Sequence, residues 1–589
     1  MSDYWSSKTV FAGWATKTDF NKIIDATVKT EKYRYNQLSK QEAETTFKKD
    51  QIEGLNRTVL TYKKQLESMD TIDEFLVRKV TSSKTDVVTA TVKSGAQEGS
   101  HTLEVKQLAS VATVSSHDIG EVAYTAAAKD MTFTYDGETY TVNVKSGMTT
   151  KELATAIATA SGNKVKTSVI DLGHESKYKL QIRGMELGAG HNIGLSAELK
   201  AVLQGQKDPA VPLPPETKDI VPTPSKNAKL VVDGVDLQRG SNSVSDVTEG
   251  VTYNLNAEEP GTTVTIKVET DFDAIVANVE KFVKLTNELR TGFDLVKNYK
   301  NEDLDKKGVN YSLKGNSQIK SVEDKLKNVL ATQGDGFIEG SGAGNDLYVT
   351  LSALGIKTIA RKGDKNYGKL EFDKNAAVIK GGTKTFMDLL KADPEAVAKV
   401  FAAEGEGSSS NSSVLEYNSS MYSFGFTKPG TYAIEYDGGT LPTTGESHDI
   451  TMKINGVERK VGYNVSTRIA TVNEGDAKGL AFKVVDTSAG THSATIAIKE
   501  GKVKETIRAL DEITEVEKGT FVVMIKGYKK QIDDPASGLK KKMADELARV
   551  TALEKRLIAQ YAATEKTLAN YQNIQKMLEF QLKSQLAKD

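Results

Sequence analysis

The stretch IEGLNRTVLTYKKQLESMDTIDEFL, residues 52–76, places apolar side chains at steps of three and four. These steps put the apolar side chains on one face of an α-helix, while polar residues fill the other faces. The stripe that we expect to meet a partner contains Ile52, Leu55, Val59, Tyr62, Leu66 and Met69. The preceding residues, 29–50, favour helix but are polar almost all round, and such a helix is usually stabilised only by a partner.

The C-terminal end of the chain has the same pattern over a greater length. No glycine or proline follows Gly538, so a helix can continue for many turns. Its apolar stripe includes Leu547, Val550, Leu553, Leu557, Tyr561, Leu568, Tyr571, Leu578 and Leu582. The two stripes could pack on each other within one subunit, or between subunits as a coiled coil. The polar segment 29–50 and the length of the C-terminal stripe favour a second subunit for at least part of them, so both stripes form our candidate assembly interface.

Between the helical ends, β-branched and polar residues alternate, which is typical of half-buried strands. Asp136-Gly137, Asp233-Gly234 and Asn455-Gly456 each interrupt such a run and predict three β-hairpins. Six of the eleven prolines fall between Pro209 and Pro224, which predicts a stiff, exposed linker. The glycine- and serine-rich residues 404–413 predict a flexible seam.

These features predict an α+β multidomain protein with helical-bundle or coiled-coil terminal segments and inserted antiparallel β domains. The expected order begins with an N-terminal export or leg segment, flexible or helical (1–40), the N-terminal helix of a helical leg domain (41–79) and the outgoing half of a first β domain (80–125). A second β domain (126–208), the proline-rich linker (209–226) and the return half of the first β domain (227–271) follow. The chain then continues with the main body of the leg domain (272–403), an additional inserted β domain (404–510) and a C-terminal helix or coiled coil (511–589).

The composition argues against several classes of protein. Basic residues number 78 and acidic residues 79, so no overall charge attracts nucleic acid or an anionic membrane. The chain has no cysteine, which excludes disulfides, thiolate nucleophiles and cysteine-ligated metals. No stretch approaches the roughly 18 apolar residues of a membrane helix, and the first residues lack the pattern of a cleavable signal peptide. We expect neither nucleic-acid binding nor membrane insertion.

No motif in the sequence indicates catalysis, a cofactor or a metal. The six histidines are never three or four residues apart, which excludes a helical metal-binding pair. Residues 363–369 match most of a phosphate loop, but Leu370 replaces the required serine or threonine and a strand-like run follows, so we expect a hairpin turn. Residues 301–305 resemble the start of a calcium loop, but Lys306 occupies the required glycine position. We therefore predict a protein that is not an enzyme and has no catalytic, cofactor-binding or metal-binding residues.

Several segments, in their order along the chain, resemble the flagellar filament cap family (FliD, flagellar hook-associated protein 2). Residues 10–24 resemble the opening of the family. Residues 75–109, above all GSHTLEVKQLA at 99–109, resemble the passage from its helical domain into its first β domain. Residues 133–160 resemble a module inserted in flagellins and hook-associated proteins. AKLVVDG at 228–234 resembles the return path, and LSALGI at 351–356 with GKLEFD at 368–373 resemble the C-terminal half.

The resemblance implies a homo-oligomeric cap, a ring of a few subunits, that promotes flagellin folding and polymerisation at the filament tip and prevents loss of flagellin monomers. The terminal helices would be its legs. The implied partners are further copies of the chain, flagellin, the hook–filament junction protein and an export chaperone. The implied location is extracellular, after type III export without a cleavable signal, and an adhesive role is also implied. The alternatives are a hook–filament junction protein, a divergent flagellin or, less favoured, a carbohydrate- or host-binding adhesin.

Overall fold

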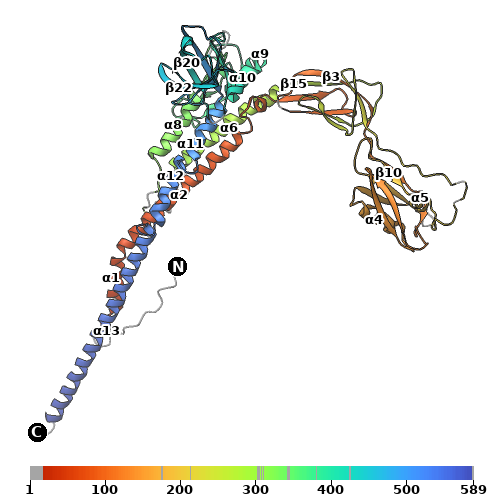
Figure 1. Ribbon diagram of the computed structural model, residues 1–589. Coiled ribbons are helices and arrows are strands. Elements are labelled where there is room, and N and C mark those ends of the chain that lie inside the picture. The colour runs from red at the N-terminus through yellow and green to blue at the C-terminus, as the bar shows by residue number, and fades with distance from the viewer. Residues whose placement is uncertain are drawn as a thin grey trace. The chain divides into compact units, whose positions relative to one another are not determined.

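The computed structural model describes residues 18–93, 95–173, 177–212, 214–215, 217–300, 306, 308, 311–340, 345–379, 381–423 and 426–586. It divides into two compact units (Figure 1). Residues 1–72 and 276–589 form the first, here called the helical unit, and residues 73–275 form the second, the β unit. Most of the family-like opening, 10–24, and the calcium-loop-like residues 301–305 lie outside the described residues.

The helical unit contains helices of 7 to 48 residues. They are α1 (Phe20–Glu31), α2 (Tyr33–Leu66), α6 (Phe272–Lys297), α8 (Ser317–Ala331), α9 (Phe386–Ala392), α10 (Pro394–Ala402), α11 (Lys502–Thr514), α12 (Thr520–Asp533) and α13 (Leu539–Leu586). Local chemistry sets several of their ends: Asn316 caps α8, and Thr385 forms a capping box with Asp388 at α9. No helix among the described residues is long and apolar enough to cross a membrane.

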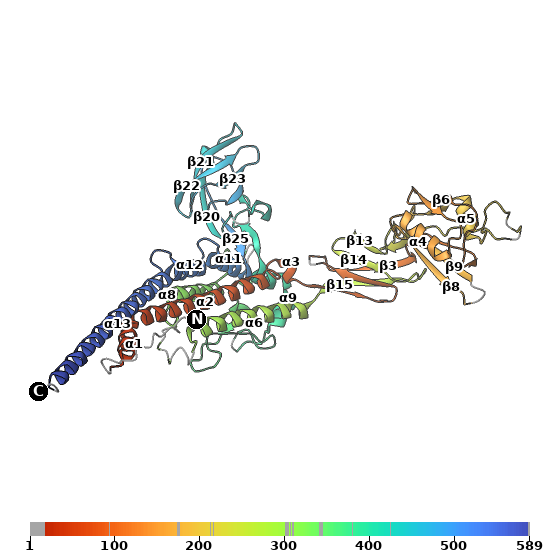
Figure 2. The same cartoon turned by 90° about the horizontal axis from the view of Figure 1, so that it is seen from below.

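The C-terminal helices lie along α2 in the opposite direction. Lys504, at the start of α11, pairs with Asp70 beyond the end of α2 at 2.8 Å, and Asp511 pairs with Lys63 at 2.5 Å. As the residue number rises in α11, its partner's number falls, so the two segments are antiparallel. α12 and α13 continue this packing on α2, and both views show α13 beside α1 and α2 (Figures 1 and 2). The prediction that a helix runs uninterrupted beyond Gly538 is confirmed.

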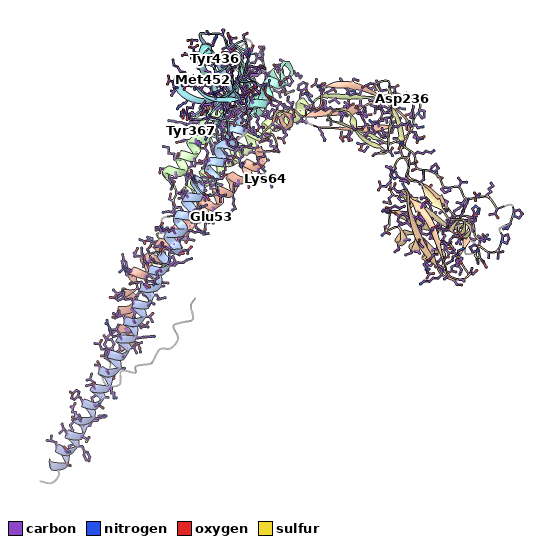
Figure 3. All side chains as sticks on the ribbon, in the orientation of Figure 1. Glu53, Lys64, Asp236, Tyr367, Tyr436 and Met452 are labelled. Atoms are coloured by element: carbon purple, nitrogen blue, oxygen red, sulfur yellow. The ribbon has the colours of Figure 1, made fainter. Side chains whose placement is uncertain are left out.

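An antiparallel β sheet is inserted in the helical unit between α10 and α11. Its strands are β18 (Glu404–Ser409), β19 (Leu415–Glu416), β20 (Gly430–Asp437), β21 (Ser447–Ile454), β22 (Val457–Asn464), β23 (Ile469–Val472), β24 (Ala481–Val484) and β25 (Thr491–Glu500). They follow the order β18-β25-β20-β21-β22-β23-β24-β19. Tyr436 and Met452, labelled in Figure 3, are buried in the core of this β insert.

The prediction of a flexible seam at 404–413 is wrong for its opening residues. Residues 404–409 form β18, which pairs with β25. Glycine is needed there for space, because a Cβ atom on Gly407 would lie 2.4 Å from the carbonyl oxygen of Ala497 and 2.5 Å from the ring of Tyr417. Glycine content alone therefore indicated flexibility where the structure has a close approach of two strands.

Two separate cores lie in the β unit, which begins near α3 (Ile72–Phe75). One core is covered by the sheets β1-β15-β3-β11-β12 and β13-β14-β2. The other is covered by β10-β6-β7 and by β4-β9-β5 with β8 on β9, together with helices α4 and α5. The bounds are β1 (Arg78–Ser82), β2 (Val88–Val92), β3 (Gly99–Gln107), β4 (Thr113–Ser115), β5 (Ile119–Gly120), β6 (Lys129–Tyr135), β7 (Glu138–Val144), α4 (Thr150–Ala160), β8 (Val165–Asp171), β9 (Lys177–Gly184), β10 (Ile193–Leu195), α5 (Ala197–Leu203), β11 (Ala228–Val232), β12 (Val235–Arg239), β13 (Ser243–Thr248), β14 (Val251–Leu255) and β15 (Val264–Thr270).

The second core begins earlier in the chain than residue 126. Val114, Ile119 and Tyr124 are buried in it, although the sequence placed them in the first β domain. Ile220, inside the expected proline-rich linker, is buried there too, and Thr223 bridges to Thr113. The linker is therefore partly packed. The division of the chain into domains otherwise stays a prediction.

All three predicted hairpins are present. Asp136-Gly137 joins β6 to β7, Asp233-Gly234 joins β11 to β12, and Asn455-Gly456 joins β21 to β22. Both residues of each pair have positive φ, as a tight two-residue hairpin turn requires. The prediction of a hairpin turn at 363–369 is also confirmed, because these residues lie between the short paired strands β16 (Lys357–Thr358) and β17 (Leu370–Glu371).

We predict that Gly527→Ala stabilises the helical unit. Gly527 lies inside α12 and a Cβ atom there would meet nothing within 4 Å, so alanine should add about 0.5–1 kcal/mol. The measurement is the urea midpoint for loss of the helical circular-dichroism signal. Gly519→Ala is the matched control and should destabilise, because its Cβ atom would lie 2.5 Å from the amide nitrogen of Glu515. Equal effects of the two variants would contradict this packing.

Candidate assembly surface

The N-terminal stripe of the candidate interface is covered within the chain. Its six residues, Ile52, Leu55, Val59, Tyr62, Leu66 and Met69, are all buried. Helices α11, α12 and α13 pack on α2, and α6 also approaches it, since a Cβ atom on Gly292 would lie 3.6 Å from Thr58. These six side chains pack the helices of one subunit together, and their assignment to an intersubunit contact stays a prediction.

Tyr62 adds a polar contact to this apolar stripe. Its hydroxyl lies 2.8 Å from the hydroxyl of Thr286, which itself donates to the carbonyl oxygen of Phe282. Tyr62 is therefore the donor in the first of these bonds. Burial raises the pKa of Tyr62 to about 12. The neutral hydroxyl links α2 to α6 at a defined position along both helices.

We predict that Leu66→Ala and Leu60→Ala, two changes of the same chemistry on one helix, differ strongly in cost. Leu66 is fully buried, so its truncation should cost about 2–5 kcal/mol. Leu60 is 44% exposed, and its truncation should cost less than about 1 kcal/mol. Urea unfolding followed by circular dichroism at one protein concentration measures both. Equal costs would contradict burial of the stripe within the subunit.

The beginning of the C-terminal stripe is also covered within the chain. Val550 is fully buried against Ile24 and Val28 of α1. Leu557 and Tyr561 are half-buried against the same cluster, and the ring of Tyr561 stacks on that of Phe20 at 4.7 Å. Arg549 pairs with Glu31 at 2.8 Å. Leu553 is half-buried, whereas Leu547 is 38% exposed.

Beyond Tyr561 the same stripe is open. The described part of α1 begins at Phe20, opposite Tyr561, and α13 continues for many residues past that point (Figures 1 and 2). Leu568 is half-buried, Tyr571 is 66% exposed, Leu578 is 53% exposed and Leu582 is 58% exposed. Ile574 lies on this face as well and is half exposed. We call Tyr571, Ile574, Leu578 and Leu582 the distal stripe.

Sequence reasoning placed Tyr571, Leu578 and Leu582 in the interface and Ile574 on the same stripe, but it left out Met577 and Phe580 beside them. Ile574, Met577 and Phe580 are each at least half exposed. Figure 3 shows side chains projecting on several sides of this part of α13. Met577 and Phe580 are three residues apart, so the same helical spacing was the signal for them. An apolar face of this kind on a long helix is a surface for another helix.

Polar clusters in the described residues do not assemble a reactive site. Among those residues, no group of three or more histidine or acidic side chains could hold a metal ion. Asp486, Ser488 and His492 superficially resemble a catalytic triad, with the Ser488 hydroxyl 3.4 Å from Nε2 of His492. Nε2 lies closer, at 2.8 Å, to the carbonyl oxygen of Ser488, and that bond requires Nε2 to donate. The ring therefore cannot take a proton from Ser488 in this arrangement.

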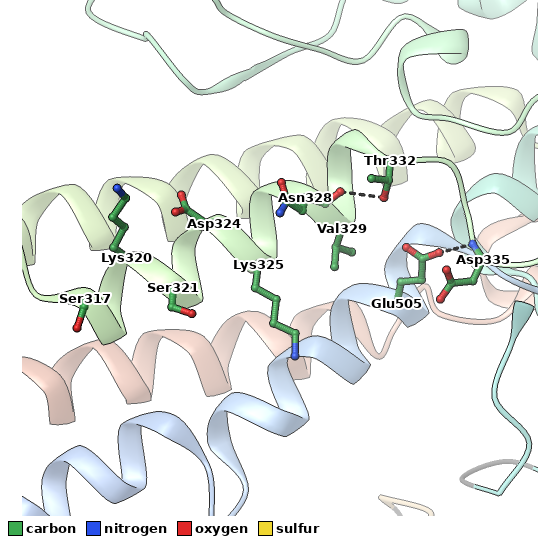
Figure 4. A pocket seen from close by; sticks show the side chains of 10 residues that line it. All are labelled: Ser317, Lys320, Ser321, Asp324, Lys325, Asn328, Val329, Thr332, Asp335 and Glu505. Carbon is green, nitrogen blue, oxygen red and sulfur yellow. Dashed lines mark hydrogen bonds between the residues drawn. The ribbon is translucent and has the colours of Figure 1, made fainter. Parts of the chain in front are cut away.

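A polar groove of about 690 Å³ runs along α8 (Figure 4). Two of the charged side chains that line it, those of Lys325 and Glu505, are engaged within the chain. Lys325 pairs with Glu512, and Glu505 accepts a hydrogen bond from the amide of Asp335 at 2.5 Å and pairs with Lys502. The groove has few apolar side chains, which makes it unlike a small-molecule site.

The chain thus combines an α+β multidomain fold with an exposed apolar face, the distal stripe, on a long helix. Two family models match it: the flagellar hook-associated protein 2 N-terminus over residues 16–112 and the flagellar hook-associated protein 2 C-terminus over residues 225–573. The second match alone spans more than half of the chain. The chain belongs to the flagellar hook-associated protein 2 (FliD) family.

Relatives with this description cover most of the chain. The A-type flagellar hook-associated protein 2 of Pseudomonas aeruginosa is 26% identical over 387 residues, which are 62% of this chain and 77% of that protein. The flagellar hook-associated protein 2 of Campylobacter jejuni is 24% identical over 524 residues, which are 80% of this chain and 77% of that protein. The crystal structure of the D1-D2-D3 domains of the Escherichia coli flagellar cap protein FliD is 21% identical and covers 60% of this chain and 90% of that one, with a TM-score of 0.43.

Proposed function

We propose that this protein is the cap of a bacterial flagellar filament, a structural protein rather than an enzyme. Its family membership supports this assignment over the junction-protein and flagellin alternatives. In this role several copies form a ring at the filament tip, promote folding and polymerisation of flagellin and prevent loss of flagellin monomers. The observation that carries the proposal is the distal stripe of α13, an apolar helical face that the described part of the chain leaves open.

We propose that a second copy of this chain covers the distal stripe. The stripe continues the face that α1 and α2 cover closer to the start of α13, so it has the spacing that packs on another helix. It contains four apolar side chains, and the charged residues Lys576, Glu579 and Lys583 lie in the same part of the helix. A small interface of this kind suits contacts that form and release as flagellin subunits are added beneath the cap.

The remaining partners and the location follow from the same role. Flagellin, the hook–filament junction protein and an export chaperone are the proposed partners, and the filament tip outside the cell is the proposed location. Export by the flagellar type III route, without a cleavable signal, belongs to the same proposal.

The test is the solution mass of the full chain and of the double variant Leu578→Gln, Leu582→Gln, measured by light scattering at several concentrations. We expect the unaltered chain to form a closed oligomer of a few subunits. The variant should shift toward monomer, because burying two amide side chains in a helical interface costs roughly 1–3 kcal/mol for each unpaired group.

The matched control is Lys576→Gln, Lys583→Gln, which introduces the same side chain at neighbouring polar positions of the same helix. It should keep the mass of the unaltered chain. Circular dichroism checks that α13 remains helical in both variants. A full chain that stays monomeric at high concentration, or an oligomer that both variants leave unchanged, would contradict assembly through the distal stripe.

A further inference from the structure

The β insert is joined to the helical unit by two strands that lie side by side. β18 begins at Glu404, β25 ends at Glu500, and these two residues are opposite each other in the ladder. The amide of Gly501 donates to the carbonyl oxygen of Ala403 at 2.9 Å. A Cβ atom on Gly501 would lie 2.3 Å from the amide nitrogen of Ala402, so the two backbones touch. We call residues 403–404 and 500–501 the neck.

Charged side chains from separate elements surround the neck. The carboxylates are Asp70, Asp335, Glu404, Glu500 and Glu505, and the cations are Lys502, Lys504 and Arg508. Glu500, Lys502 and Glu505 are buried. Because five carboxylates face three cations, the cluster carries an excess of negative charge in a partly desolvated place. Such an arrangement favours keeping one carboxyl protonated.

Two of the cations tie the neck to the helices. Lys504 lies 2.8 Å from Asp70, beyond the end of α2, and 3.3 Å from Glu404 on β18. Arg508 on α11 lies 2.5 Å from Asp335 and 2.6 Å from Glu500.

Glu500 is the least well satisfied member of the cluster. Its Oε2 atom is buried and accepts no hydrogen bond. Arg508 lies 2.6 Å from this atom, but the contact lacks the alignment of a hydrogen bond. Burial raises the pKa of Glu500 to about 7. Arg508 and Lys504 oppose the shift, whereas Glu505 and Asp335 add to it. Glu404 and the phenol of Tyr422 lie near the same charges, and burial raises the pKa of Tyr422 as well.

The direction of the effect follows from proton linkage. The pKa of Glu500 in the closed neck is higher than that of an exposed glutamate, so the closed neck holds a proton that the open neck releases. The closed neck is therefore most stable in mildly acidic solution. Its stability decreases with rising pH until Glu500 is ionised in both forms, above about pH 7.

We propose that the neck is a pH-sensitive lock that holds the β insert on the helices while Glu500 is protonated and lets it open more often once Glu500 is ionised. The inference is independent of the cap function. It concerns only how firmly the insert, residues 404–500, is held by α2, α11 and the segment around Asp335.

Hydrogen exchange of the full chain tests the lock. The reporters are the amides of Glu500 and Gly501, which donate to the carbonyl oxygens of Asp335 and Ala403 at 2.9 Å. After correction for the intrinsic pH dependence of exchange, the opening equilibrium should rise about tenfold from pH 6 to pH 8. Glu500→Gln, which stays neutral at every pH, should remove that rise.

Glu435→Gln is the matched control, because Glu435 is a glutamate of the same insert that pairs with Lys453 at the surface. It should keep the tenfold rise. An unaltered chain with the same opening at both pH values would overturn the proposal, and that result does not depend on any variant folding. A rise that persists in Glu500→Gln, or that Glu505→Gln abolishes while Glu500→Gln does not, would also overturn it.

Discussion

The apolar stripe of α2 is the constraint on which the helical unit depends. A helix of 34 residues with one apolar face cannot stay single in water, so several other segments must cover that face. α6 covers part of it through the contact between Tyr62 and Thr286. The C-terminal helices cover the rest in antiparallel order, as the ion pair of Lys63 with Asp511 shows. Residues from both ends of the chain thus complete one core, while the apolar face at the far end of α13 is exposed.

Local signals in the sequence identified those elements that depend on local chemistry. Asn455-Gly456 predicted a hairpin because its positive φ values suit few other residue pairs. The absence of glycine and proline after Gly538 predicted α13, because no residue in that segment interrupts a helix. Which segment covers an apolar stripe depends on residues far away in the sequence. The periodicity of the stripe is the same whether the covering segment belongs to the same chain or to another. For that reason Val59 and Leu578 looked equivalent in the sequence, although one is fully buried and the other is not.

Packing and charge between distant segments could not be predicted. β18 was taken for a seam because glycine spacing does not show that Tyr417 covers Gly407. The ionic cluster at the neck combines residues from the end of α2, from the segment near Asp335 and from α11, and no sequence window contains them together. The cluster buries Glu500 among other carboxylates at the one point where the insert enters and leaves the helical unit. The helical unit thus combines a packed core around α2, an exposed apolar face at the end of α13 and a charged neck at the β insert.

The two helical stripes differ in what covers them: the same chain covers the stripe of α2, and a second copy is proposed to cover the distal part of α13. Because the chain has no cysteine, single substitutions Val59→Cys and Leu578→Cys give unambiguous thiol probes. Their rates of reaction with a thiol reagent would be compared in dilute, dissociated protein and in concentrated, assembled protein. We predict that Val59→Cys is protected in both and that Leu578→Cys becomes protected only on assembly. Equal reactivity of Leu578→Cys in the two states, with assembly verified by light scattering, would contradict this difference between the stripes.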